Sequence, residues 1–432
     1  MTDDRTIPNR YMVISSDGHA SARVKDYREY VDAKYLAEFD QEVEAGETVR
    51  AAWRDGAAKQ VGKGLNWPEE TVNAFESSPT LQPGGHPGLF NPDQRLRDMD
   101  ADGVAGEVLF PDGHTETHPP FSGRGRGRDA SKVASRSKEP YDIELQQAGA
   151  KTYNRWLADF CSKSPERWAG IAVMPLWEID RAVKELEWAA KVGLRGGMML
   201  PPMVPELPGF NDPYYEPVWA ACEDLEMPVN QHVGGHMPDY GTRPEAFALL
   251  RTEANFFSRR SLWFLMWGGV FERHPKLKFA LTEQEADWVP YTLRELDATY
   301  DSPFAGPGLR ATLSLRPSEY WARQCFVGAT YMSRDESDMR YDIGVKNVLW
   351  GSDYPHMETT FPHSKESLRK SYAGLPRHEV KLMIGENAVR AYNFDMDALA
   401  RVADRIGPTP DEIDQPLMER PADALVGTLG FR

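Results

Sequence analysis

The stretch NVLWGSDYPHME, Asn347 to Glu358, decides the fold class to which we assign this chain. A short apolar run, Val348 to Trp350, ends at Gly351-Ser352 and is followed at once by Asp353. Because Asp and Pro are common turn formers, the simplest interpretation is a buried strand that ends in a turn. The alternative is that Asp353 stands at the rim of a barrel, where a carboxylate can bind a metal ion or carry a proton. The rest of the chain decides between the two.

Seven other apolar runs share this pattern of a short run, a loop and then a helical segment. Runs of this length without alternation are typical of strands buried on both faces, as in parallel sheets. The eight runs span residues 11–17, 106–111, 170–175, 193–202, 227–235, 277–285, 324–332 and 347–355. Eight alternating strand–helix units predict a (β/α)8 TIM barrel. A doubly wound sheet is the alternative, but no glycine-rich phosphate loop follows any of the runs.

Helices are predicted between these strands from the spacing of apolar residues. Residues 149–161, 178–193 and 211–228 each place apolar side chains on one helical face. Asp212-Pro213 has the pattern of a helix start, and Gly193 that of a helix end. We therefore expect helices to cover the predicted sheet.

Three segments do not fit the repeat. Residues 20–95 are far longer than an ordinary strand-to-helix connection, and we expect them to form an insertion, or lid, over the active site. Residues 118–140 are rich in Arg, Gly and Ser, which favours an exposed mobile loop over a binding site. Residues 396–432 form a C-terminal extension beyond a barrel of residues 1–395, packed outside it or against a neighbouring subunit.

Composition and charge exclude several classes of function. The chain has 432 residues and a formal net charge of −16. An acidic chain without a basic stripe is a poor nucleic-acid binder. The cysteines Cys161, Cys222 and Cys325 are far apart, so neither a thiolate zinc site nor a disulfide framework is indicated. No apolar run is long enough for a membrane span, and the first residues lack a signal-peptide core, so we expect a cytoplasmic protein without membrane contact.

Polar side chains occur where several predicted strands end. Asp17 and His19 end the first strand, His232 the fifth, Glu283 the sixth and Asp353 the eighth. In a barrel these carboxyl ends meet on one face, where active sites lie. Asp17 and His19 are two residues apart, so both point to the same side of a strand. Imidazole with carboxylate suits zinc, iron or manganese better than calcium, so the sequence predicts a divalent metal site.

Each of these residues also has a plainer interpretation. Asp17-Gly18 could be a simple turn, and a lone His such as His232 is more often a hydrogen-bonded core residue than a ligand. Their joint placement at the first, fifth and eighth strand ends favours ligands. Glu283 could be a further ligand, a base, or a carboxylate that orients His232.

Three more residues are candidates for contact with a substrate. His236 and His356 follow the fifth and eighth strands in loops at the rim, although each is more typical of a supporting loop residue. Arg195, near the fourth strand, could pair with a substrate carboxylate. Its position early in the strand favours a structural ion pair instead.

The sequence resembles the amidohydrolase-2 family of the amidohydrolase superfamily, which includes the aminocarboxymuconate-semialdehyde decarboxylase-like enzymes. The matching stretches include VISSDGH at 13–19, GSDYPH at 351–356 and GENAVRAY at 385–392, and the likeness runs over roughly residues 11–394. It implies a (β/α)8 barrel with one divalent ion, bound by Asp17, His19, His232 and Asp353. Asp17 departs from the His or Glu of the family, and Glu283 replaces the His found in many family decarboxylases.

These observations lead us to expect a metal-dependent hydrolase of a small organic substrate, carboxylate-bearing or cyclic, in which Asp353 takes a proton from metal-bound water. Zinc is favoured, with manganese or iron as alternatives. The same ligands could serve a non-oxidative decarboxylase, or a hydratase, of an aromatic or unsaturated carboxylic acid, but the missing His at the sixth strand favours hydrolysis. A third hypothesis is an inactive barrel that serves as a binding subunit. We also expect a small-molecule substrate and a homodimer or higher homo-oligomer.

Overall fold

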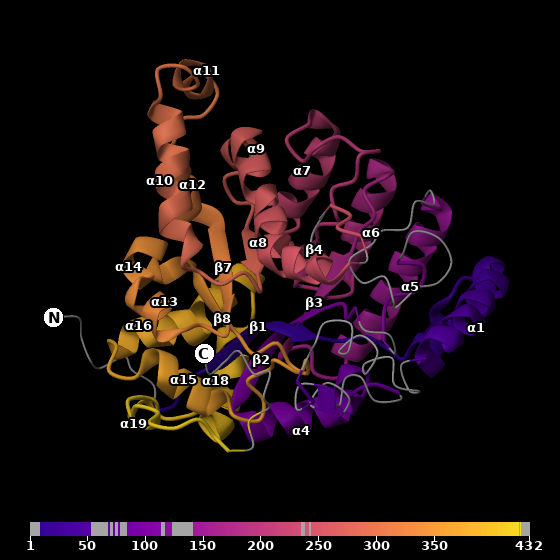
Figure 1. Cartoon of the computed structure of the whole chain (residues 1–432), viewed down its shortest axis with the longest axis horizontal. Coiled ribbons are helices and arrows are strands. Elements are labelled where there is room, and N and C mark those ends of the chain that lie inside the picture. Colours follow the sequence, from indigo (N-terminus) through magenta and orange to yellow (C-terminus); the bar gives the residue numbers. More distant parts are fainter. Residues whose placement is uncertain are drawn as a thin grey trace.

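The chain folds around a barrel of eight parallel strands, seen in the centre of Figure 1. The computed structural model describes residues 9–52, 68–69, 72–73, 77, 84–113, 117–122, 141–234, 238–241, 243–422 and 424. The strands are β1 (Val13–His19), β2 (Val104–Phe110), β3 (Trp168–Val173), β4 (Gly197–Met199), β5 (Val229–His232), β6 (Phe279–Thr282), β7 (Cys325–Thr330) and β8 (Val348–Gly351). Their spatial order follows their order in the chain, which confirms the predicted TIM barrel and excludes a doubly wound sheet.

Helices surround this barrel, as Figure 1 shows. Those between the second and the last strand are α5 (Ile143–Cys161), α6 (Ile179–Lys191), η8 (Pro213–Tyr215), α7 (Glu216–Asp224), α8 (Pro244–Trp267), α9 (Val270–Arg273), α10 (Trp288–Asp301), α11 (Gly306–Arg310), α12 (Pro317–Gln324), α13 (Arg334–Asp338), α14 (Arg340–Ile343) and η9 (Val345–Asn347). The predicted helices at 149–161, 178–193 and 211–228 are confirmed. The side chain of Asp212 accepts a hydrogen bond from the backbone N–H of Tyr214, as a helix cap does.

Segments at the two ends of the chain complete the molecule. Before the second strand lie η2 (Val24–Tyr30), η3 (Ala33–Tyr35), α1 (Leu36–Ala52), η6 (Pro87–Leu89) and α4 (Pro92–Asp102). After the last strand come α15 (Ser364–Tyr372), α16 (Arg377–Lys381), η10 (Leu382–Glu386), α17 (Asn387–Tyr392), α18 (Met396–Ile406) and α19 (Pro410–Ile413). Most of the predicted mobile loop at 118–140, and part of the predicted insertion at 20–95, lies outside the described residues.

The helices α17 and α18 close the end of the barrel where the strands begin. Tyr392 of α17 and Leu399 of α18 belong to one buried apolar cluster that also contains strand residues. The strand residues include Ile14, Val108, Ile171 and Leu349. The hydroxyl of Tyr392 donates a hydrogen bond to Oδ1 of Asn230 on β5 (3.0 Å). The first part of the C-terminal extension therefore packs on the barrel as a plug.

The barrel closes where β1 meets β8, and serine side chains hold this seam. Oγ of Ser15 accepts a hydrogen bond from the backbone N–H of Ser352 (2.9 Å), and Oγ of Ser16 donates to the carbonyl of Trp350 (2.9 Å). The backbone N–H of Asp353 donates to the carbonyl of Asp17 (2.9 Å). The first and last strands are therefore fixed to each other directly beside the predicted metal ligands.

A helical arm formed by α10, α11 and α12 projects from the body at the top of Figure 1. Phe304 at its tip is 96% exposed. The sequence pattern did not predict this arm. Among the described residues, we find no helix with the length and apolarity needed to cross a membrane.

Candidate metal centre and its cavity

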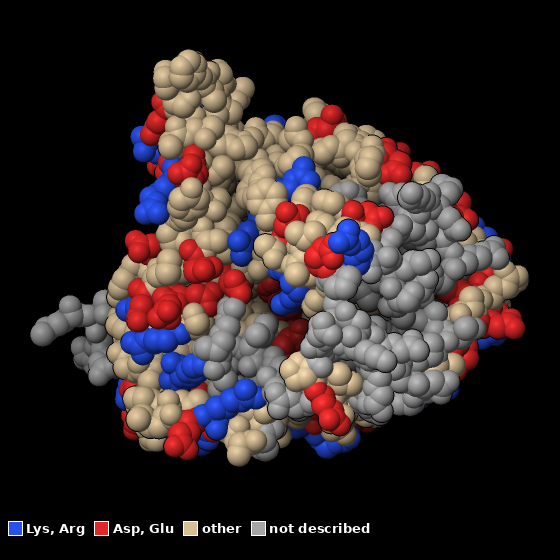
Figure 2. Space-filling model, in the orientation of Figure 1, with Lys and Arg blue, Asp and Glu red and all other residues tan. Residues whose placement is uncertain are grey.

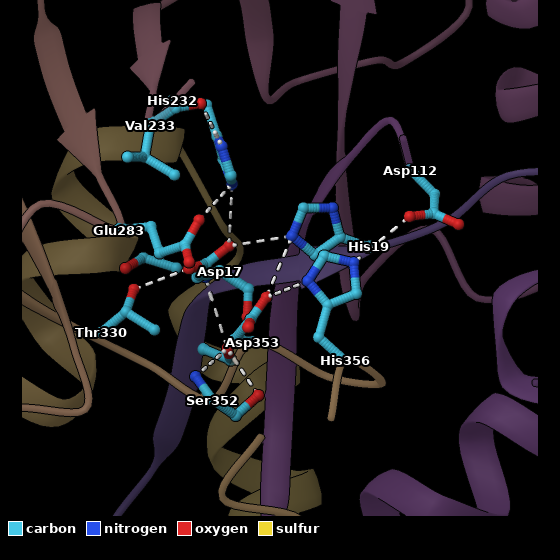
Figure 3. Close-up of polar contacts among 12 residues, drawn as sticks. Asp17, His19, Asp112, His232, Val233, Glu283, Thr330, Ser352, Asp353 and His356 are labelled. Carbon is cyan, nitrogen blue, oxygen red and sulfur yellow. Dashed lines mark hydrogen bonds and ion pairs between the residues drawn. The ribbon is translucent and has the colours of Figure 1, made fainter. Parts of the chain in front are cut away.

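The four predicted metal ligands converge at the carboxyl ends of the strands, as Figure 3 shows. Nε2 of His19 lies 3.5 Å from Oδ1 of Asp17 and 3.1 Å from Oδ1 of Asp353. Nε2 of His232 lies 3.5 Å from the same oxygen of Asp17. Ligand atoms of Asp17, His19 and His232 lie within 4.8 Å of one another, and Oδ1 of Asp353 is connected to this group through His19.

These four atoms fit a divalent ion by their surroundings as well as by their positions. Each is a buried atom without a hydrogen-bond partner in the structure. Nδ1 of His19 lies 3.2 Å from the carbonyl oxygen of Pro111, and Nδ1 of His232 lies 3.1 Å from that of Val233. Because a carbonyl only accepts, both Nδ1 atoms carry the hydrogen, and Nε2 is the nitrogen that would present a lone pair to an ion.

Charges at the site keep both aspartates ionised. Burial alone would raise the pKa of Asp17, but its contacts with His19 and His232 outweigh burial and hold this pKa well below the ordinary value. The pKa of Asp353 is likewise lowered despite burial, chiefly by the charge of His356 and by the contact with His19. Ionised carboxylates are the form that binds metal ions. Oδ2 of Asp17 is also fixed, since it accepts a hydrogen bond from Oγ1 of Thr330 (2.6 Å).

The stretch Gly351-Ser352-Asp353 can now be explained. A Cβ atom on Gly351 would lie 2.7 Å from Cβ of Asp17 and 2.9 Å from Oγ1 of Thr330, so only glycine fits there. Asp353 has a φ of 55°, in the left-handed region that L residues rarely adopt. This backbone shape turns the carboxylate from the strand end toward the site.

The same left-handed shape recurs after two neighbouring strands. Glu283 follows β6 with a φ of 56°, and Tyr331 follows β7 with a φ of 60°. Such strained non-glycine residues are concentrated at functional sites. The hydroxyl of Tyr331 donates a hydrogen bond to Oδ2 of Asp353, which leaves Oδ1 toward His19. Tyr331 was not predicted as a site residue, because nothing in the neighbouring sequence indicates this backbone shape.

Glu283 lies beside the four ligands, with Oε2 3.6 Å from Nε2 of His232. Burial raises the pKa of Glu283 well above its ordinary value, and the negative charges of Asp353 and Asp17 raise it further. Carboxylate oxygens of Glu283, Asp353 and Glu358 also lie within 4.8 Å of one another. The structure therefore places Glu283 next to the site, and the choice among ligand, base and supporting carboxylate stays open.

His356 occupies the other side of the site. Its ring stacks on that of His19, with centroids 3.9 Å apart. Nδ1 lies 2.8 Å from Oδ1 of Asp353, and Nε2 lies 3.2 Å from Oδ1 of Asp112. These two carboxylates raise the pKa of His356 well above its ordinary value, although burial acts in the opposite direction. Asp112 follows β2 and was missed, although its place after a predicted strand is the same signal that identified the four ligands.

The two remaining predicted site residues are not brought to this centre by the described structure. Arg195 lies before β4, where one guanidinium nitrogen donates to the carbonyl of Asn393 (3.3 Å). Asn393 also accepts a hydrogen bond from Lys278, just before β6, so Arg195 stands at the opposite end of the barrel. Its predicted contact with a substrate must be corrected, because strands begin at that end. His236 lies outside the described residues.

A buried ion pair stabilises the backbone next to the site. Nε of Arg95, on α4, lies 2.7 Å from Oε2 of Glu107 on β2, and neither side chain is more than 2% exposed. Nη1 of Arg95 donates to the carbonyl of His19 (2.7 Å). Arg95 therefore links α4, β2 and the end of β1, and it fixes the backbone that carries His19.

A cavity of about 530 Å³ opens directly from the site. His19, His232 and His356 line one end of it, and apolar side chains line most of the rest. Figure 2 shows this face of the molecule hollowed near its middle, with acidic side chains visible in the hollow. A cluster of metal-ligand side chains at one end of an apolar cavity is the arrangement of an enzyme active site.

Fold and site together define a metal-dependent (β/α)8 enzyme. Residues 126–394, more than half of the chain, match the family described as Amidohydrolase, and the chain belongs to that family. It is similar to the gamma-resorcylate decarboxylase of Rhodococcus jostii, 26% identical over 227 residues, which cover 48% of this chain and 66% of the relative. That match spans just under two thirds of the relative's length. For the same enzyme from a Rhizobium species the identity is 24% over 281 residues, or 61% of this chain and 76% of the relative.

Solved structures agree on the fold. The 5-carboxyvanillate decarboxylase of Sphingomonas paucimobilis superposes with a TM-score of 0.58 at 19% identity, covering 89% of this chain and 100% of that one. An amidohydrolase of Mycobacterium avium subsp. paratuberculosis gives a TM-score of 0.63 at 19% identity, with coverages of 88% and 99%. A dihydroxybenzoic acid decarboxylase of a Polaromonas species, with bound manganese and 2-nitroresorcinol, gives 0.56 at 17% identity, with coverages of 90% and 99%.

These comparisons correct the prediction of a hydrolase. The curated relatives are decarboxylases, although this chain lacks the sixth-strand His that we took as the mark of one. The ligand set could not separate the two reactions, because the same four side chains can hold an ion that activates water or one that binds a carboxylate. The apolar cavity beside these side chains was not predicted from the sequence, because its lining is brought together only by tertiary packing.

Proposed function

We propose that this protein is a metal-dependent, non-oxidative decarboxylase of an aromatic carboxylic acid, which makes it a carbon–carbon lyase. The observation that supports this proposal is a largely apolar cavity that is lined by His19 and His232, two members of the candidate metal-binding group. Loss of carbon dioxide converts a charged carboxylate into a neutral gas, and apolar surroundings favour the neutral side of that change. The decarboxylase activity of the curated relatives supports the same conclusion.

A divalent ion held by Asp17, His19, His232 and Asp353 would bind the substrate carboxylate and an adjacent oxygen. Two imidazoles with two carboxylates are compatible with zinc, manganese or iron. Zinc was favoured by the sequence, and the manganese in the similar Polaromonas structure supports manganese as the first ion to test against it.

The residues around the ion have distinct tasks in this proposal. The proton comes from the imidazolium of His356, whose Nδ1 lies 2.8 Å from Asp353, and the carboxylate of Asp353 passes it to the ring carbon that carries the substrate carboxylate. The bond between that carbon and the carboxylate then breaks, its electron pair returns to the ring and carbon dioxide leaves, and His356 regains a proton from the solvent. Tyr331 holds the second oxygen of Asp353, and Asp112 holds the other face of His356.

The test begins with elemental analysis of the purified protein, followed by a screen of hydroxybenzoates in which released carbon dioxide is measured. We expect gas release that is lost after chelation and restored by manganese or zinc. In D₂O the product should carry one deuterium at the position that the carboxylate left. Cleavage of amides or lactones without gas release from any aromatic acid would contradict the proposal.

A further inference from the structure

The cavity lies on one side of the metal site only. It extends from His19, His232 and His356 beneath the loops that follow β2, β3, β4 and β5. Glu283 and Tyr331, which follow β6 and β7, are not among the residues that line it. Figure 3 shows the same division, with Glu283 on one side of Asp17 and Asp112 on the other. A substrate bound to the ion must therefore extend toward the loops of β2 to β5.

One wall of the cavity is aromatic and already fixed in place. It is formed by Tyr141, before α5, and Trp177, after β3, so both stand beyond the strand ends that carry the imidazoles. The ring centroids of Tyr141 and Trp177 lie 5.2 Å apart. Nε1 of Trp177 donates to Oε1 of Gln146 (2.7 Å), and the carbonyl of Trp177 accepts a hydrogen bond from the hydroxyl of Tyr214 (2.8 Å). A wall that is ordered before binding loses little conformational freedom when a ligand packs against it.

The surface between the imidazoles and this wall is apolar. It is formed largely by Met174, Met199 and prolines of the β3 and β4 loops. Among the described residues that line the cavity there is no Lys or Arg, and Asp112 is the one carboxylate. Asp112 lies at the metal end, beside His356. Among these described residues, a charged group beside the aromatic wall would lose its hydration without gaining an oppositely charged partner.

The cavity is also larger than a single ring requires. Its volume of about 530 Å³ lies within the range of roughly 300–1,000 Å³ that holds drug-sized ligands. A benzoate bound through its carboxylate beside the imidazoles would fill only part of this volume. The ring position opposite the carboxylate points away from the ion, along the cavity.

We propose that the substrate is an aromatic acid that carries, opposite its carboxylate, a bulky, uncharged and apolar group that packs against Trp177 and Tyr141. This inference rests on the proposed decarboxylase function for the position of the carboxylate. It goes beyond that function because it specifies the group at the other end of the molecule.

Binding to the manganese-loaded protein, measured by calorimetry, tests the proposal without relying on turnover. Three ligands suffice: 2,6-dihydroxybenzoate, its 4-phenyl derivative, and the derivative with a carboxylate on that phenyl ring. We expect the phenyl compound to bind at least tenfold more tightly than either of the others. Equal affinity for the first two would overturn the inference, and so would equal affinity for the last two.

Variants of the aromatic wall show whether these side chains cause the preference for the phenyl compound. Trp177→Ala should reduce the preference for the phenyl compound to about threefold or less, and Tyr141→Ala provides a second variant that tests the same wall. Trp188→Ala on α6 is the matched control, because its ring lies under the guanidinium of Arg155 (3.5 Å) and does not line the cavity. An unchanged preference in both wall variants would overturn the inference.

Carbon dioxide release is recorded separately on the same ligands. Tight, wall-dependent binding without gas release would sustain the inference about the cavity and refute the proposed function. Gas release with no preference between the small and the phenyl acid would sustain the function and refute the inference.

Discussion

Asp353 contacts His19, His356 and Tyr331 at once, so its replacement is the sharpest change at a single residue. Asp353→Asn should fold with a melting temperature close to that of the parent, because Asn tolerates the left-handed backbone at this position. Asn cannot carry the proton, so kcat for carbon dioxide release should fall by at least about 10²-fold. The ion should remain bound through the other ligands, although less tightly.

Asp338→Asn on α13 is the control for this prediction, because Asp338 is an exposed partner of Arg334 away from the site. It should leave kcat unchanged. If Asp353→Asn kept an activity within a few-fold of the parent on its true substrate, Asp353 would be a turn residue, and the proton would have to come from another group.

At this scale the sequence could show which residues stand at strand ends, but not how their side chains meet. The four predicted ligands are brought together because each stands at the carboxyl end of a strand, and these ends meet on one face of the barrel. They are Asp17, His19, His232 and Asp353, and their role as ligands stays a prediction. The prediction that Arg195 contacts the substrate is wrong, because a residue just before a strand lies at the opposite face of the barrel. The contact between Tyr331 and Asp353 depends on two left-handed residues on different strands, which no local pattern encodes.

Among the elements, α4 is joined to β2 and β1 through the buried pair of Arg95 and Glu107. Arg95→Met would leave the carboxylate of Glu107 buried without a partner, and we expect the free energy of unfolding to fall by roughly 3–5 kcal/mol. Urea denaturation measures this change. Arg97→Met, on the exposed side of the same helix, should change it by less than about 0.5 kcal/mol. Equal effects of the two changes would mean that the buried pair contributes nothing particular.

The junction between α4 and α15 should make stability depend on pH. Asp102 ends α4 and accepts a hydrogen bond from the backbone N–H of Ser364 (3.0 Å) at the start of α15. Burial raises the pKa of Asp102 to about 7. Because the folded pKa is above the unfolded value, the folded state holds a proton that the unfolded state has lost between about pH 4 and pH 7. The contribution of this group to stability is therefore present at low pH and lost as the pH rises through 7.

Asp102→Asn tests this junction. Asn keeps the acceptor for Ser364 but does not titrate, so the variant should gain stability relative to the parent as the pH rises from 5 to 8. Unfolding curves at both pH values give the comparison. Parallel pH dependence in the two proteins would exclude Asp102 as the source.

The elements themselves were largely predictable, because strands buried on both faces produce short apolar runs and all eight runs became strands. The arm of α10, α11 and α12 and the plug of α17 and α18 were not. Both depend on where a helix docks after it forms, and the plug shares its buried cluster with β1, β2, β3 and β8.

For the whole molecule, an ion at the site would join β1, β5 and β8. We expect manganese or zinc at about 100 times its Kd to stabilise the fold by about 2.7 kcal/mol, since the unfolded chain has no assembled site. Scanning calorimetry should show a melting temperature several degrees higher with the ion than after chelation. His232→Ala should lose most of this shift. The same shift in His232→Ala as in the parent would place the stabilising ion elsewhere.

The serine seam between β1 and β8 can form only after β8 has been synthesised, long after β1. Ser15 and Ser352, which meet there, are 337 positions apart. At about 5–20 residues per second, β8 leaves the ribosome roughly 20–70 s after β1. During this interval Asp17 and His19 have been synthesised, but their partner Asp353 has not. A chain that stops before Val348 would have no complete set of ligands, so capture of the ion at this site would mark the synthesis of the last strand and the closure of the barrel.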